Sequence, residues 1–194
     1  GLYKALGQRY DGDQHFEQII ITETAGVSSR DFKRTLPQFA AAWPKTPVIF
    51  YMNFVDSAQL AQELMALMEA NQIGVGGPDI LPPQPISPYG EDDGSLVLRG
   101  AGAVRIWDGS SKDFGRTDYR GRIPVAYSYE HAHNIPPDKV VDYAVNTQKN
   151  NYILWSSIDW LTPELNWSTG VLPVIKRAAP LQTACPSAIK GCVQ

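Results

Sequence analysis

The chain has 194 residues, 43% of them hydrophobic and 19% charged, and its net charge at pH 7 is −3. This composition supports one folded domain with a sizeable core. It contains no apolar run of about 18 residues, so we expect no membrane span. It also lacks a Lys/Arg cluster, which argues against a nucleic-acid partner, because neutralising phosphates requires concentrated positive charge.

The first part of the chain alternates between helical and strand-like patterns. The strand patterns are runs of successive apolar residues, such as IIIT and VIFYM, which suit strands buried on both faces. The clearest helix has Leu60, Leu64 and Met68 at helical spacing. In chain order we predict a helix at 2–10, a strand at 16–23, a helix at 28–43, a strand at 46–54 and a helix at 57–71.

The second part repeats this alternation after a long interruption. QIGVGGPD forms a short third strand, and residues 77–121 then carry little regular pattern, which is typical of a functional loop or an insertion. Pro137 favours the first turn of a later helix. The remaining predicted elements are a strand at 123–130, a helix at 136–148, a strand at 152–160 and a short helix at 170–177.

Five strands, each followed by a helix or a long loop, predict an α/β fold with a mainly parallel sheet in a single domain over residues 1–194. Two architectures fit this pattern. One is the C-terminal five-strand part of a (β/α)8 barrel of the TIM type, and the alternative is a five-stranded doubly wound sheet. A whole barrel is excluded, since it typically needs about 250 residues.

Two glutamates end strand-like runs, with two further predicted strands between them. Glu23 closes IIITE, and Glu130 closes VAYSYE. Parallel strands deliver the side chains at their carboxyl ends into the ligand crevice, and barrel enzymes take their catalytic groups from these ends. Paired carboxylates placed in this way are typical of retaining glycosidases.

The segment ALGQRYDGDQHFEQIIITE resembles the helix, Arg-Tyr pair, turn, apolar strand and Glu that lead into the acid/base residue of glycoside hydrolases of clan A. In that superfamily the acid/base residue ends the fourth barrel strand and the nucleophile ends the seventh. Glu23 and Glu130 are separated by the same strand interval. The resemblance covers nearly the whole chain, which would correspond to strands four to eight.

The resemblance implies a glycosidase that cleaves O-glycosidic bonds of an oligo- or polysaccharide with retention. Glu23 would act as the acid and then the base, and Glu130 as the nucleophile. Many members carry Asn just before the acid/base residue, where this chain has Thr22. The eighth strand of the clan often ends near a tryptophan that floors the sugar site, a role open to Trp155 or Trp160, with Trp155 slightly favoured.

Other candidate sugar-contacting residues follow from their positions in the sequence. Asn53 and Asp79 fall at strand ends, although turn chemistry around Pro78 explains Asp79 almost as well. Trp107 and Tyr119 lie in the long segment, where flat aromatic faces can stack on sugar rings or anchor the loop itself.

The C-terminal tail, residues 180–194, contains Cys185 and Cys192, which favour a short disulfide loop over two free thiols. The predicted disulfide and the composition favour an extracellular or secreted protein. We expect no metal site, because the three histidines are distant in sequence from the cysteines and no HExxH or CxxC spacing occurs. We also expect no cofactor, since GVGGPD runs into proline and makes a poor phosphate-binding turn.

Two further expectations concern partners and activity. An open five-stranded arc of a barrel has two free edges, so we expect an N-terminal barrel portion with three strands to complete the fold. The alternative function is a catalytically silent carbohydrate-binding or structural protein with a glycosidase-like fold, because a fold alone does not guarantee chemistry.

Overall fold

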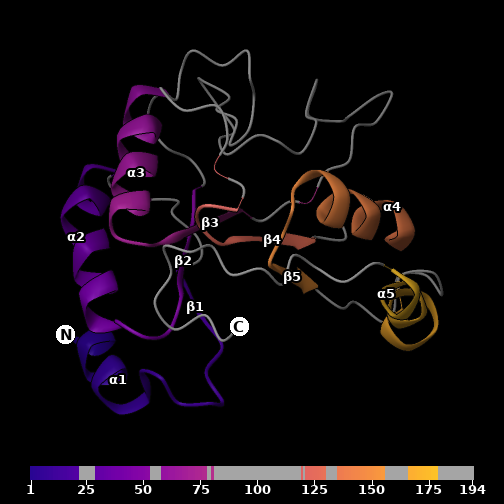
Figure 1. Cartoon of the computed structure of the whole chain (residues 1–194), viewed down its shortest axis with the longest axis horizontal. Coiled ribbons are helices and arrows are strands. Elements are labelled where there is room, and N and C mark those ends of the chain that lie inside the picture. Colours follow the sequence, from indigo (N-terminus) through magenta and orange to yellow (C-terminus); the bar gives the residue numbers. More distant parts are fainter. Residues whose placement is uncertain are drawn as a thin grey trace.

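The computed structural model describes residues 1–21, 29–52, 58–77, 80, 119, 121–129, 135–155 and 166–178. Within these residues, strands and helices alternate along the chain (Figure 1). In chain order they are α1 (Leu2–Tyr10), β1 (Ile19–Ile21), α2 (Ser29–Ala42), β2 (Val48–Tyr51), α3 (Ala58–Ala70), β3 (Gly74–Gly77), β4 (Val125–Tyr129), α4 (Pro137–Asp142), the π-helical segment η3 (Tyr143–Thr147), β5 (Tyr152–Trp155), the π-helical segment η5 (Trp167–Val171) and α5 (Leu172–Arg177).

The strands form one five-stranded sheet in the order β1-β2-β3-β4-β5, and every neighbouring pair is parallel. The predicted α/β class with a parallel sheet is therefore confirmed. The doubly wound alternative is wrong, because such a sheet reverses its strand order at a switch point, whereas this order never reverses.

The two faces of the sheet are covered differently. Phe50, Val75 and Tyr127 point to the face against which the helices pack, and they belong to the large core that includes Leu36 of α2 and Leu64 of α3. The opposite face, which we call the inner face, carries a smaller cluster of strand residues: Ile49, Tyr51 and Ala126, with Ile20, Tyr152 and Leu154 packed beside them. None of these inner-face residues comes from a helix, so the described helices cover one face only.

The sheet is curled. Figure 1 shows the strand direction turning steadily from β1 and β2 to β4 and β5. Burial raises the pKa of Tyr152, at the start of β5, and the charge of Glu17, just before β1, raises it further. On the inner face, Ile20 of β1 and both Tyr152 and Leu154 of β5 pack beside the same cluster of Ile49, Tyr51 and Ala126.

The main core lies between the sheet and helices α2 and α3. Phe32 of α2 meets Phe50 of β2 edge to face, with ring centroids 4.6 Å apart. Leu36, Leu64 and Met68 are fully buried around this pair. The predicted helices at 28–43 and 57–71 are confirmed within one residue at each end, and Pro37 lies inside α2 without ending it.

Only a few residues of the predicted long segment 77–121 are described. Gly77 ends β3, Ile80 donates its backbone N–H to the Ser128 carbonyl at 2.8 Å, and the Tyr119 carbonyl accepts from the N–H of Arg122. Ile80 and Tyr119 are both buried in the main core, so each anchors an end of this segment. The cysteine tail, 180–194, lies outside the described residues.

Candidate active site

The carboxyl ends of the described strands lie along one edge of the sheet because all of them are parallel. Glu23 follows the last residue of β1 by two positions, and Glu130 follows β4 directly. Both glutamates lie outside the described residues, as do Asn53, Asp79, Trp107 and Trp160. The carboxyl ends of β1 and β4, the strands that precede the two glutamates, therefore lie at the same edge of the sheet, with β2 and β3 between them.

A pair of hydroxyl groups occupies the inner face near this edge. The Tyr51 Oη of β2 and the Ser128 Oγ of β4 lie 2.7 Å apart, a short hydrogen bond that bridges over the intervening strand β3. Tyr51 is almost fully buried, whereas Ser128 is half-buried. One of the two hydroxyl groups thus lies on the strand that leads to Glu130, and the other lies on β2, next to the strand that leads to Glu23.

Glycine in β3 makes this bridge possible. A Cβ at Gly76 would lie 2.0 Å from the Ala126 carbonyl oxygen and 2.6 Å from Cε1 of Tyr51. The ring of Tyr51 therefore lies directly over the Gly76 backbone. Any side chain at position 76 would push the ring away and separate the Tyr51 hydroxyl from Ser128.

The Tyr129 side chain holds the chain on either side of Glu130. Its hydroxyl donates to the Ile135 carbonyl at 2.9 Å and accepts from the Ile135 N–H at 3.0 Å. Burial raises the pKa of Tyr129, while the hydrogen bond to Ile135 opposes this rise, so the group keeps the proton that it donates. The end of β4 is thereby fixed to the start of the segment that leads into α4.

Trp155 lies on the helix-covered face rather than on the inner face. It packs against the main core, and its ring lies 4.7 Å from that of Tyr129 in a tilted arrangement. Its Nε1 is buried and has no hydrogen-bond partner within the described part of the chain. The half-buried ring thus packs against the core, and its role at the floor of a sugar site stays a prediction.

Tyr119 is also a core residue. Its side chain is only 2% exposed and belongs to the large hydrophobic cluster. A ring that stacks on a sugar must present a face to solvent. Trp107 and Trp160, two other aromatic candidates for ligand contact, lie outside the described residues.

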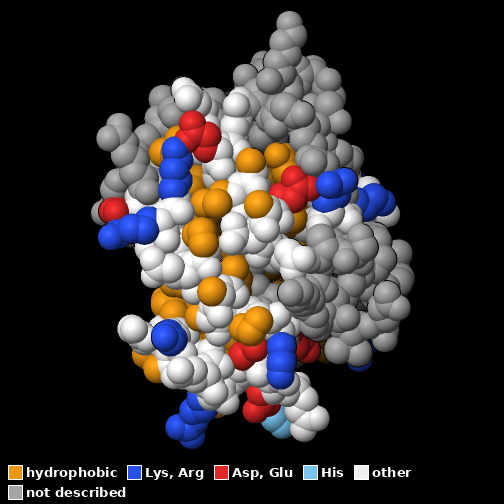
Figure 2. Space-filling model, turned by 60° about the vertical axis from the view of Figure 1, so that its left-hand side comes forward, with side chains coloured by type: hydrophobic (Ala, Val, Ile, Leu, Met, Phe, Trp, Pro, Cys, Tyr) orange, Lys and Arg blue, Asp and Glu red, His pale blue; other side chains and the backbone are white. Residues whose placement is uncertain are grey.

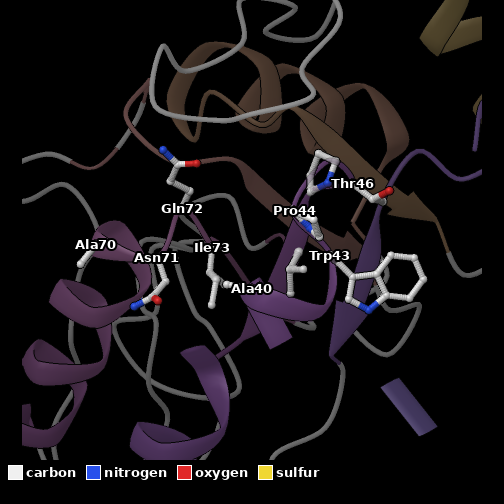
Figure 3. Close-up of a pocket in the computed structure, with 10 residues that line it drawn as sticks. Ala40, Trp43, Pro44, Thr46, Ala70, Asn71, Gln72 and Ile73 are labelled. Carbon is white, nitrogen blue, oxygen red and sulfur yellow. The ribbon is translucent and has the colours of Figure 1, made fainter. Parts of the chain in front are cut away.

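A cavity of about 310 Å³ lies at the opposite, amino-terminal edge of the sheet, between the ends of α2 and α3. Figure 3 shows Asn71 and Gln72 on one side of it and Pro44 and Thr46 on the other, with the Trp43 ring pointing away. No ionisable side chain of the described residues lines it. In parallel (β/α) units this edge serves stability, while chemistry takes place at the carboxyl edge, so we do not place a site here.

The charged side chains that the structure describes lie on the surface. On the side that carries α2 and α3, hydrophobic side chains run down the middle with charged ones around them (Figure 2). Lys33 of α2 pairs there with Glu63 of α3, and this hydrogen bond is the main reason that the pKa of Glu63 is lowered. Exposed pairs of this kind add little stability.

Two other kinds of feature are absent from the described residues. They contain no group of three or more His, Cys, Asp or Glu side chains arranged to hold a metal ion. None of the described helices has the length and apolar character needed to cross a membrane.

Comparison with known proteins gives no relative for this chain: no protein-family model, curated protein or solved structure matches it.

Proposed function

We propose that this chain is the C-terminal five-strand part of a (β/α)8 barrel and acts as a retaining glycoside hydrolase with Glu23 and Glu130 as its catalytic pair. The observation that carries the proposal is the unreversed parallel order of the curled sheet, with the described helices on one face. Barrels have this arrangement, because their helices form an outer ring and their strands line the interior.

The spacing of the strands fits a pair of cooperating carboxylates. The strands β1 and β4 are three positions apart, which corresponds to roughly 14 Å along a flat sheet. Side chains stand roughly perpendicular to a flat sheet, so curling is needed to bring two carboxylates on the inner face towards the separation of about 5–5.5 Å that retaining glycosidases use.

The register of β4 supports the role of Glu130. Ala126 and Ser128 lie on the inner face, and extending the strand by one residue would bring position 130 to the same face. In the proposed mechanism the Glu130 carboxylate attacks the anomeric carbon while Glu23 gives its proton to the leaving oxygen. Glu23 then takes a proton from water, which attacks the same carbon and releases Glu130.

The remaining parts of the proposal concern the ligand and the partner. Asn53 and Asp79 follow β2 and β3 closely in sequence, where side chains can bind sugar hydroxyls, and Trp107 and Trp160 would stack on sugar rings. Within the described residues β1 and β5 each have one unpaired edge. An N-terminal barrel portion would pair with both, in a secreted protein.

Covalent labelling tests the proposal directly. The folded chain is treated with a panel of 2-deoxy-2-fluoro glycosides with activated leaving groups, covering gluco, galacto, manno and xylo configurations. Loss of the 2-hydroxyl slows breakdown of the glycosyl-enzyme, because contacts to this hydroxyl strengthen in the transition state. We expect one member of the panel to add its glycosyl mass to the peptide that contains Glu130.

Three variants sharpen the result. Glu130→Gln should abolish the label, whereas Glu23→Gln should retain it, since an activated leaving group departs without a proton. Glu17→Gln is the matched control, because Glu17 is exposed before the amino end of β1. A label on another carboxylate, or no label from any sugar, would contradict the proposal. Sugar binding without any label would instead favour a catalytically silent carbohydrate-binding protein.

A further inference from the structure

The large hydrophobic side chains that stay exposed lie at the two ends of the row of helices. Within the described part of the chain they belong to α1, the turn after it, η5 and α5, whereas α2, α3 and α4, over the middle of the sheet, carry none. Single exposed apolar side chains are ordinary, but a grouping of them marks an interaction site. The exposed residues are Leu2, Tyr3, Leu6, Phe16, Trp167 and Ile175.

The first group forms an apolar stripe along α1. Leu2, Leu6 and Tyr10 recur every four residues and so share one side of the helix, and Leu2 is 71% exposed. Phe16 continues the stripe, because its ring stacks on that of Tyr10 with centroids 4.8 Å apart. The stripe leads into β1, whose outer edge has no neighbouring strand among the described residues. An uncovered helix side next to an unpaired strand edge is what an absent (β/α) neighbour would leave.

The second group lies at the other end of the sheet. The helix α5 has no buried residue, Ile175 on it is 39% exposed, and Trp167 at the start of η5 is 38% exposed. Both elements follow β5, which also has one unpaired edge in the described part of the chain. Figure 1 shows α1 and α5 at opposite ends of the row of helices, with α2, α3 and α4 between them.

The two end helices also share a charge pattern. Lys4 and Arg9 are the charged residues of α1, and Lys176 and Arg177 are those of α5, so neither helix contains an acidic residue. The three helices between them each contain at least one. None of the four cations has an ion-pair partner among the described residues. Both ends of the sheet therefore favour a partner with negative charge.

We propose that the α1 stripe and the exposed side of η5 and α5 form one docking surface, which binds a single partner of three parallel (β/α) units whose outer helices are apolar and acidic. The outer strands of this partner pair with β1 and β5. This inference rests on the proposed barrel and adds where the completing portion binds and which charge it carries. A second copy of the chain fits less well, because it would bring α1 of one copy to α5 of the other, and both are positive.

The test uses a designed fragment that contains three (β/α) units of an idealised barrel. Two versions differ only at the facing polar positions of the outer helices, which are Glu in one and Lys in the other. Each is co-expressed with the full chain, and the complex is measured by sedimentation velocity and by hydrogen exchange. We expect the Glu version to form a one-to-one complex that slows amide exchange in both β1 and β5, and the Lys version to bind at least about tenfold more weakly.

Three results would overturn the inference. They are no complex with the Glu version, equal binding of both versions, and slowed exchange in only one of the two strands. Self-association of the chain alone that slows exchange in β1 and β5 would identify a second copy as the occupant and overturn it as well.

Point variants locate the contact. Leu6→Lys and Ile175→Lys should each weaken binding of the Glu version by at least about tenfold, because each places a charge in an apolar contact. Ala66→Lys is the matched control, since Ala66 is exposed on α3, away from both ends, and it should bind as the unaltered chain does. Circular dichroism verifies that all three are folded. Equal affinities in the three variants would show that the fragment binds elsewhere and would refute the docking surface.

Complex formation requires no turnover, which separates this inference from the proposed function. A complex with the expected charge preference, in a chain that no fluoro-sugar labels, would refute the glycosidase and keep the docking surface. A chain that is labelled at Glu130 but forms no complex would refute the docking surface alone.

Discussion

Glu130→Gln should lower kcat/KM for an activated aryl glycoside by at least about 10³-fold, which is within the range that a positioned carboxyl group contributes to catalysis. The amide has nearly the same shape as the carboxylate but cannot form the glycosyl ester. We expect the midpoint of urea unfolding to stay within experimental error, because the preceding strand is held by Tyr129 and Ile135 independently of this side chain.

Initial rates on the sugar identified by labelling, with circular dichroism on the same samples, measure this effect. Glu17→Gln provides the comparison, since it removes an exposed carboxylate near the opposite end of β1. Its rate should match that of the unaltered chain. Equal rates for Glu130→Gln and Glu17→Gln would show that Glu130 is not the nucleophile.

Gly76→Ala should destabilise the fold by about 3 kcal/mol, towards the upper end of the cost of overpacking. The added Cβ would lie 2.0 Å from the Ala126 carbonyl oxygen, which belongs to the backbone of the adjacent strand β4. That oxygen cannot move away without disturbing the ladder between β3 and β4. The Tyr51 ring would also be displaced from Ser128.

Chemical unfolding monitored by circular dichroism gives the difference in stability. Gly121→Ala is a suitable control, because Gly121 has φ of +74° but a Cβ added there would meet no described atom within 4 Å. This variant carries only the conformational cost of a left-handed residue, about 1 kcal/mol. If Gly76→Ala lowers the free energy of unfolding by no more than Gly121→Ala does, the backbone around β3 can shift to accept a Cβ at little cost, and the expectation is wrong.

The sequence was sufficient to predict the elements and their direction. The runs around Ile20, Phe50 and Ala126 are apolar at successive positions, which is typical of strands covered on both faces, and alternation with helices implied parallel pairing. The choice between a barrel part and a doubly wound sheet required the strand order, because both architectures produce the same pattern along the chain.

The candidate site was less accessible to prediction. Tyr51 and Ser128 are 77 residues apart, and their contact depends on the pairing of β2, β3 and β4. The sequence signals were a tyrosine near a strand end and glycines in the neighbouring strand, but neither identifies the partner. Trp155 shows the same limit, because an aromatic ring is equally suited to a core and to a sugar site. The face of β5 on which the ring lies becomes known only from the structure.

The most direct test of the central claim is the distance between the Glu23 and Glu130 carboxyl carbons in a crystal structure. The proposed mechanism predicts about 5–5.5 Å, with both groups facing the inner surface near Tyr51. A separation well beyond about 10 Å, or carboxylates on opposite faces of the sheet, would contradict it, because one sugar could not then contact both groups.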